Sequence, residues 1–234
     1  MTNKEFLEKL NNLNISYNEE MLDKLDIYCD FLLEYNTHTN LTAIRNREDV
    51  YLKHFYDSLT VTKAINLNSI DTMLDIGSGA GFPGIVLKIF YPHLKLTVLD
   101  SNNKKTTFIT KLVEKLNLQE VNIVNDRAEE YAKKGIKYDL VTSRAVAYID
   151  IILELSSYFV NEKGTILLMK GNIDEEQSIL DEHQKELNVI NYNVTNCDLS
   201  VEDERNILVI KTKPNNKVLN YNQILKRHNK WTSK

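Results

Sequence analysis

Apolar residues near the start of the chain recur with helical spacing. Leu22, Leu25, Cys29 and Leu32 follow one another at intervals of three and four residues. This period gives a helix one apolar face, and such a face needs another element to pack on. We therefore predict a helical N-terminal extension over residues 1–65.

From residue 72 onwards the pattern changes to short apolar runs separated by amphipathic stretches. This alternation predicts strands and helices in turn, and hence a parallel sheet covered by helices on both faces. After a helix expected over 174–187, two last strands are separated by the acidic turn 200–204 and should pair antiparallel at one edge. The seven expected strands are 73–76, 96–99, 121–124, 140–141, 166–169, 189–195 and 207–211.

The predicted fold class is therefore α/β, with a doubly wound, mostly parallel seven-stranded sheet. The sheet and its helices should occupy residues 66–213, and a basic C-terminal tail should follow over residues 214–234.

Composition narrows the class of protein. Of the 234 residues, 42% are hydrophobic and 26% are charged, as is typical of a globular protein with its own core. The first ten residues are polar, and no apolar run approaches the roughly 18 residues that span a bilayer, so we expect a cytoplasmic protein without membrane contact. Cys29 and Cys197 lack metal-ligand spacing, which favours two buried thiols and no metal site.

The net charge of -4 conceals an uneven distribution. Residues 211–234 hold seven lysines and arginines and no acid, so residues 1–210 carry -4 - 7 = -11. Tyr221 and Trp231 stand among these cations. Such a tail can bind a polyanion by charge and stacking, or it can be a solvated, frayed terminus.

Four of the seven glycines lie in the stretch LDIGSGAGFPG, residues 74–84. A strand, a glycine turn and a helix start follow one another here, which places a ligand at the carboxyl ends of the strands. Glycines let the backbone approach a ligand, and the amides at a helix start favour a negative group. Gly79, Gly81 and Gly84 also match the dinucleotide fingerprint, which alone is a weak signal.

The acidic residues around this turn help to choose the ligand. Asp75, two residues before Gly77, would repel a pyrophosphate but suits a ligand with an ammonium group. S-adenosylmethionine has an ammonium, a carboxylate and a sulfonium, and no phosphate. Asp100 ends the next strand, where an acid accepts hydrogen bonds from ribose hydroxyls in either case. The segment 125–129 can reach an adenine, although Asp126 can equally cap a helix.

Several motifs occur in an order and spacing that carry a family resemblance. They are 75–84, 99–101 with Lys104 and Lys105, 127–129, 143–145 and 170–171, with 36–42 and 54–59 upstream. Together they resemble the glucose-inhibited division protein B family, the ribosomal RNA small subunit methyltransferase G enzymes. The resemblance covers roughly residues 20–212.

This resemblance implies a class I, Rossmann-like methyltransferase that uses S-adenosylmethionine to methylate N7 of a guanine in 16S rRNA of the small ribosomal subunit. The residues implied to contact the methyl donor are Gly77, Phe82, Ala128, Glu129 and Arg144. Gly79 belongs to the same glycine turn. Two positions depart from the family: Tyr35 replaces the usual Trp, and the tail lacks the usual Tyr-Pro-Arg segment.

The side chains available for catalysis also indicate which atom accepts the methyl group. Methylation of pyrimidine carbon-5 needs a cysteine nucleophile, and both cysteines are misplaced for that. Methylation of an adenine amine is commonly served by an Asn/Asp-Pro-Pro-aromatic turn, whereas residues 142–146 read TSRAV. Guanine N7 has a free lone pair and loses no proton, so positioning alone can supply catalysis.

Arg144 is the predicted catalytic residue. It leaves the fourth strand beside the glycine turn, where its guanidinium can hold the donor's carboxylate, guanine O6 or a phosphate. His54, Asp57 and Ser58 lie within five residues on one helix, so we do not expect them to form a hydrolase triad.

Other functions remain open from the sequence. A methyltransferase for a small molecule or another RNA would share the whole core. A nicotinamide dehydrogenase rests only on the dinucleotide fingerprint, and a ribosome-assembly factor would bind RNA and keep the donor as a structural ligand. The expected oligomeric state is a monomer.

Overall fold

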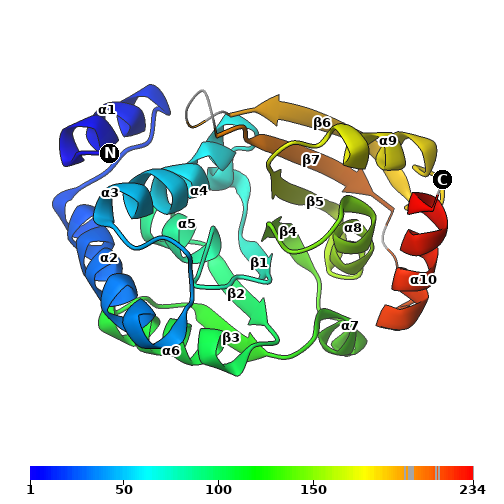
Figure 1. Ribbon diagram of the computed structural model, residues 1–234, viewed down its shortest axis with the longest axis horizontal. Helices are drawn as coiled ribbons and strands as arrows, with labels where there is room; N and C mark the ends of the chain where they lie inside the picture. The colour runs from blue at the N-terminus through cyan, green and yellow to red at the C-terminus, as the bar shows by residue number, and fades with distance from the viewer. Residues whose placement is uncertain (198, 200–202, 214, 216, 234) are drawn as a thin grey trace.

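The central feature of the computed structural model is one seven-stranded sheet (Figure 1). The structure describes residues 1–233 except 198, 200–202, 214 and 216. The strand order is β3-β2-β1-β4-β5-β7-β6. The strands are β1 (Thr72–Ile76), β2 (Lys95–Asp100), β3 (Val121–Asn125), β4 (Tyr138–Arg144), β5 (Val160–Lys170), β6 (Val189–Asn196) and β7 (Asn206–Thr212).

The pairing of the strands confirms the predicted doubly wound sheet. Strands β1 to β5 run parallel to one another, whereas β7 runs antiparallel to both β5 and β6. The expected antiparallel pair therefore lies at one edge, although residues 200–202 of the acidic turn lie outside the described part of the chain. The strand order reverses between β1 and β4, which is where this kind of sheet binds ligands.

Helices cover both faces of the sheet. They are α1 (Asn3–Asn12), α2 (Glu19–Thr39), α3 (Arg47–Val50), α4 (Asp57–Leu59), α5 (Gly84–Phe90), α6 (Asn103–Lys115), α7 (Ala128–Tyr131), α8 (Ile149–Ser157), α9 (Asp174–Glu182) and α10 (Tyr221–Thr232). A π-helical segment, Tyr51–Tyr56, joins α3 to α4. Helix α9 ends five residues before the predicted boundary at 187.

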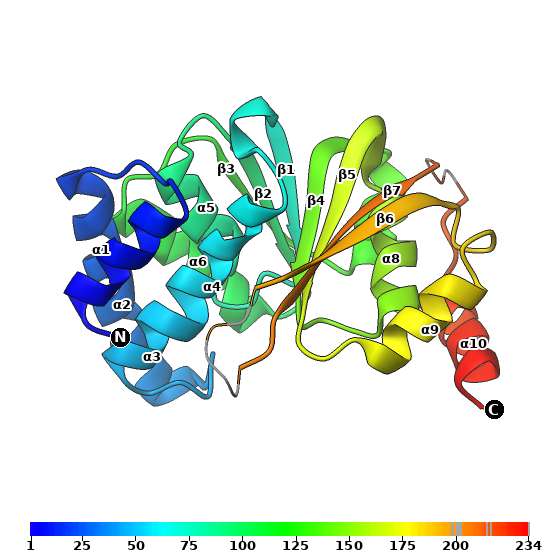
Figure 2. The same ribbon diagram turned by 90° about the horizontal axis from the view of Figure 1, so that it is seen from above.

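The two faces carry two separate hydrophobic clusters. Seen along the sheet, α1 to α6 lie on one side and α8, α9 and α10 on the other (Figure 2). One cluster joins the N-terminal helices to α5, α6 and the sheet, and the other joins α8 and α10 to the opposite face. The predicted helical extension thus packs directly on the sheet domain.

Helix α2 shows how the sequence produces this packing. The Asn18 side chain caps its start by accepting the amide of Met21, and Asn40 ends it in the left-handed conformation. Leu25, Cys29 and Leu32 are fully buried, as their spacing predicts. Cys29 and Cys197 are both buried thiols, which confirms that expectation.

The tail forms a docked helix rather than a frayed terminus over residues 221–232. Asn220 and Gln223 form a capping box at the start of α10, and Ile224 is fully buried against the second cluster. Lys234, the last of the tail's cations, lies outside the described residues.

Candidate functional site

A cavity of about 350 Å³ opens at the carboxyl ends of the strands, beside the reversal in strand order. Most of its lining lies at the carboxyl ends of four strands: 76–77 at the end of β1, 99–101 at the end of β2, 126–129 after β3 and 145–147 after β4. Its volume falls within the roughly 300 to 1,000 Å³ of small-molecule sites. The cavity therefore lies where the glycine turn predicted a ligand.

Gly77 forms the inner wall of this cavity. Its φ of +67° is in the left-handed region, and its amide donates to the carbonyl of Leu99 at 2.7 Å. A Cβ at this position would lie 2.4 Å from Cγ2 of Val146 across the cavity wall. A side chain here would therefore be strained by the backbone and would enter the ligand space.

Asp100 ties the glycine turn to the second strand. Its Oδ2 accepts the amide of Gly79 at 3.0 Å, and its Oδ1 accepts the amide of Asn102 at 2.8 Å. The ammonium of Lys105 lies 3.8 Å from Oδ2. A carboxylate offers about four acceptor positions, so Asp100 retains capacity for the hydroxyls of a ribose in the cavity that it lines.

Asp75 lies underneath the same turn and is fully buried. Its Oδ2 accepts the amide of Gly84, the first residue of α5, at 2.9 Å. The amide of Ile85 donates to the carbonyl of Gly81. The negative group expected at the helix start is therefore the protein's own carboxylate. Burial raises the pKa of Asp75 to about 7, although the hydrogen bond from the Gly84 amide opposes that shift.

The segment after β3 closes the far end of the cavity. Ala128 and Glu129 begin α7, and Glu129 is buried and accepts from Nε of Arg127 at 2.5 Å. Asp126 does not cap this helix, because Arg127 occupies the N-cap position and Asp126 accepts the amide of its own neighbour. Asp126 lines the cavity instead.

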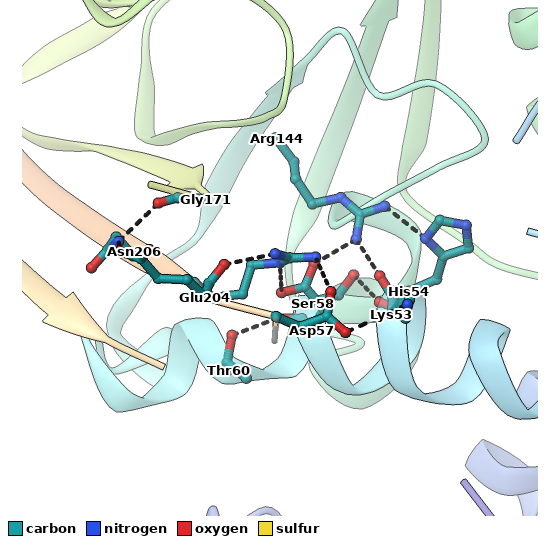
Figure 3. Close-up of polar contacts among 11 residues, drawn as sticks. Lys53, His54, Asp57, Ser58, Thr60, Arg144, Gly171, Glu204 and Asn206 are labelled. Atoms are coloured by element: carbon teal, nitrogen blue, oxygen red, sulfur yellow. Dashed lines mark hydrogen bonds and ion pairs between the residues drawn. The ribbon is translucent and has the colours of Figure 1, made fainter. Parts of the chain in front are cut away.

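Arg144 lies at the end of β4 in a buried polar cluster (Figure 3). Its Nη1 donates to Oδ2 of Asp57 at 2.9 Å and to the carbonyl of Lys53 at 3.0 Å. Nε of Arg205 lies 3.4 Å from the other oxygen of Asp57. The guanidinium also stands over the ring of Phe82, 5.0 Å from its centre. The N-terminal helices therefore fix the orientation of this arginine.

His54 belongs to the same cluster and is neutral. Its Nδ1 lies 3.0 Å from Nη2 of Arg144, which can only donate, so Nδ1 accepts and Nε2 carries the proton towards Thr42 at 2.9 Å. Burial and the charge of Arg144 lower the pKa of His54 to about 3. The hydroxyl of Ser58 donates to the carbonyl of His54, so these residues form no hydrolase triad, as predicted.

The loop after β4 is held by Lys170. Its ammonium donates to the carbonyl of Ala147 and to Glu176, each at 2.5 Å, and the side chain is almost completely covered. Residues 145–147 line the cavity, with Ala145 at a φ of +54°. Lys170, which the resemblance singled out with Gly171, thus supports one wall of the site.

The eight predicted site residues fall into two groups in the structure. Those that line the cavity are Gly77, Asp100, Ala128 and Glu129. Those that lie outside its lining, all of them described residues, are Asp75, Gly79, Phe82 and Arg144. The first two of these support the glycine turn, and the other two contact each other beside the N-terminal helices.

Other residues that line the cavity were missed from the sequence. They include Val146, Ile151, Leu155 and Tyr221. Two of these lie on α8 and one begins α10, so distant segments of the chain meet here. An apolar helical face gave no signal of a ligand, because the same pattern is expected of an ordinary core helix.

The described residues contain no group of three or more His, Cys, Asp or Glu side chains arranged to hold a metal ion. Among the helices that the structure describes, none is long and apolar enough to cross a membrane.

Comparison with solved structures identifies the fold. A precorrin-6y C5,15-methyltransferase from Geobacter metallireducens aligns with a TM-score of 0.53 and 18% identity, covering 68% of this chain and 88% of that one. TYW2 from M. jannaschii, solved in complex with AdoMet, aligns with a TM-score of 0.52 and 16% identity, covering 68% and 77%. These similarities concern the methyltransferase fold alone.

Comparison of sequences identifies the family. The profile of the GidB family, rRNA small subunit methyltransferase G, matches residues 21–208. Ribosomal RNA small subunit methyltransferase G of Bacillus subtilis is 38% identical over 218 residues, covering 90% of each chain. The protein of that name from Mesoplasma florum is 49% identical over 167 residues, covering 70% of each chain. This chain therefore belongs to the rRNA small subunit methyltransferase G family.

Proposed function

We propose that this protein transfers a methyl group from S-adenosylmethionine to N7 of a guanine in 16S rRNA of the small ribosomal subunit. The observation that carries the proposal is the cavity at the reversal in strand order, bounded by Gly77 and Asp100, in a chain of this family. When bound, S-adenosylmethionine supplies a methyl group on a sulfonium, which is open to in-line attack by a lone pair.

The residues around the cavity fit this donor. Gly77 leaves room that a Cβ would fill, and Asp100 has acceptor capacity for ribose hydroxyls. Leu99, Ile151 and Leu155 give the cavity apolar surface for the nucleoside. No part of the donor needs a phosphate site, which distinguishes it from a nicotinamide dinucleotide.

Arg144 is the proposed catalytic residue, acting by orientation. Its guanidinium is held by Asp57, the Lys53 carbonyl and His54, so its position is set before the reactants bind. Guanine N7 needs no proton removed. His54 does not serve as a base, because both of its ring nitrogens have partners and its pKa is lowered to about 3.

The remaining parts of the proposal are carried over from the sequence analysis. The division into an extension (1–65), a methyltransferase domain (66–213) and a basic tail (214–234) is kept. We propose a cytoplasmic monomer without a metal that acts on 16S rRNA or the assembled small subunit.

Two measurements test the proposed function. Calorimetric titration should detect S-adenosylhomocysteine and not NAD, and the reverse result would favour the dehydrogenase. Mapping of N7-methylguanine should reveal one 16S rRNA site that is unmethylated in cells lacking the protein and methylated after its addition. Naked 16S rRNA and assembled subunits, supplied separately, would identify the substrate. Donor binding without any loss of rRNA methylation in those cells would favour an assembly factor or another acceptor.

A further inference from the structure

Tyr221, the first residue of the tail helix α10, lines the donor cavity. It reaches the end of the cavity that Asp126, Arg127, Ala128 and Glu129 form. The guanidinium of Arg127 lies over its ring, 4.8 Å from the centre. A ring and a guanidinium thus stand together at this site, and among the described residues of the tail only Tyr221 lines it.

Helix α10 is anchored by buried carboxylates, so this position is built into the fold. Nη1 of Arg227 donates to Glu154 at 2.8 Å, and Nδ1 of His228 lies 3.0 Å from Asp150. Both carboxylates are buried on α8, at 3% and 0% side-chain exposure. Ile224 completes the contact from the apolar side of α10 and is itself fully buried.

Helix α8 links this anchor to the cavity. Asp150 and Glu154 are four residues apart and share one face, which holds α10. Ile151 and Leu155 follow each of them by one residue and line the cavity. One helix therefore positions both the tail and an apolar wall of the site.

We propose that Tyr221 is a donor-binding residue that contacts the nucleoside end of S-adenosylmethionine, and that α10 forms the outer wall of the donor site. This inference rests on the proposed function, since the ligand is the donor named there. The opposite end of the cavity, at Gly77 and residues 145–147, lies beside the ends of β1 and β4, next to the proposed catalytic Arg144. The aromatic ring therefore stands at the end away from the reaction, where an adenine offers a face for stacking.

The two sides of helix α10 then serve different purposes. The cations of α10 that face solvent, such as Lys226, remain available to a polyanion. Tyr221, Arg227 and His228 face the protein and hold the wall of the cavity. Removal of the tail is thus expected to weaken donor binding as well as any contact with RNA.

The test is calorimetric titration of the full-length protein with S-adenosylhomocysteine. Tyr221→Ala should weaken binding roughly tenfold, because it removes one stacking contact. Tyr221→Phe should bind like the wild type, since it retains the ring. Lys226→Ala, on the exposed side of the same helix, is the matched control and should leave the affinity unchanged. Competition by free adenosine should weaken by the same factor in Tyr221→Ala, whereas competition by methionine should not.

The outcomes distinguish this inference from the function on which it rests. If wild type binds S-adenosylhomocysteine, Gly77→Val abolishes binding and Tyr221→Ala stays within about twofold of wild type, the tail wall is wrong and the donor site stands. If wild type fails to bind, the donor itself is wrong. Tyr221→Leu, which keeps the bulk of the side chain, serves as a second variant in case Tyr221→Ala loses its circular dichroism spectrum.

Discussion

Asp57→Asn is the substitution with the most to reveal about the buried cluster. Asp57 is 2% exposed and pairs with Arg144 at 2.9 Å and Arg205 at 3.4 Å. The asparagine keeps the shape of the side chain and removes its charge. Two guanidinium groups, both largely shielded from water, would then face a neutral amide.

The expected loss of stability is large for a single substitution. Removing one member of a buried ion pair costs about 3 to 5 kcal/mol, and the retained amide oxygen favours the lower end. For a chain of this size each kcal/mol lowers Tm by roughly 2 to 4 °C, so a fall of roughly 6 to 12 °C is expected. Asp71→Asn is the matched control, because its pair with Lys95 spans 3.2 Å and is exposed, with an expected cost under about 1 kcal/mol.

Thermal unfolding and urea titration measure both variants. Single-turnover methyl transfer, measured below the unfolding range, adds a readout of orientation. It should slow in Asp57→Asn because Arg144 loses a partner that fixes it, and should not change in Asp71→Asn. Equal destabilisation by the two substitutions would refute the energetic role of the cluster. An unchanged transfer rate in Asp57→Asn would refute its role in positioning.

Three further predictions concern the donor, the acceptor and acid stability. Gly77→Val should abolish binding of S-adenosylhomocysteine, and Asp100→Ala should weaken binding by roughly 1 to 3 kcal/mol. Both are measured by calorimetry. Wild-type affinity in a folded Gly77→Val variant would exclude the proposed donor site. The single-turnover rate should be nearly flat between about pH 6 and about pH 9, with Arg144→Ala slower throughout, whereas a steep rise tracking one ionisation would reveal a base and a different acceptor atom. The pKa of His54 is lowered from 6.5 to about 3, so its native state binds fewer protons and stability falls as pH drops through that window. Urea titrations at pH 7 and pH 4.5 measure the free energy of unfolding of the wild type and of His54→Gln. Between these two pH values the wild type should lose about 2 to 3 kcal/mol more than His54→Gln, and equal losses in the two proteins would contradict this prediction.

The sheet was predictable because each strand is marked by a short apolar run in its own sequence. Apolar runs such as 73–76 and 166–169 need burial on both faces, and the parallel arrangement follows from the helices between them. Gly77 and Asp100 were predictable for the same reason, since Gly77 immediately follows β1 and Asp100 is the last residue of β2. Residues at the carboxyl ends of the strands could therefore be predicted to lie together, because the sheet topology alone places them there.

Contacts between distant segments were not predictable in this way. The sequence presents Tyr221 as a stacking residue in a basic tail. Its place at the cavity depends on the packing of α10 against α8, including the bond from Arg227 to Glu154, 73 residues away. The Arg144 cluster depends on Asp57, 87 residues earlier in the chain. The local hydrophobic pattern carries no information about these ion pairs, because each charged residue taken alone is predicted to be exposed.

The N-terminal helices complete the site as well as covering the sheet. Tyr28 on α2 donates to the carbonyl of Ala80 inside the glycine turn, and its ring stacks on Phe82 with centres 5.3 Å apart. The ring of His54, which bonds to Arg144, also stacks on Phe82, with ring centres 4.2 Å apart. A chain of contacts thus runs from the extension through the turn to the proposed catalytic arginine. A fragment starting at residue 66 would keep the seven strands yet lose the hydrogen-bond partners of Arg144 at Lys53, His54 and Asp57. We therefore expect such a fragment to bind the donor more readily than it transfers the methyl group.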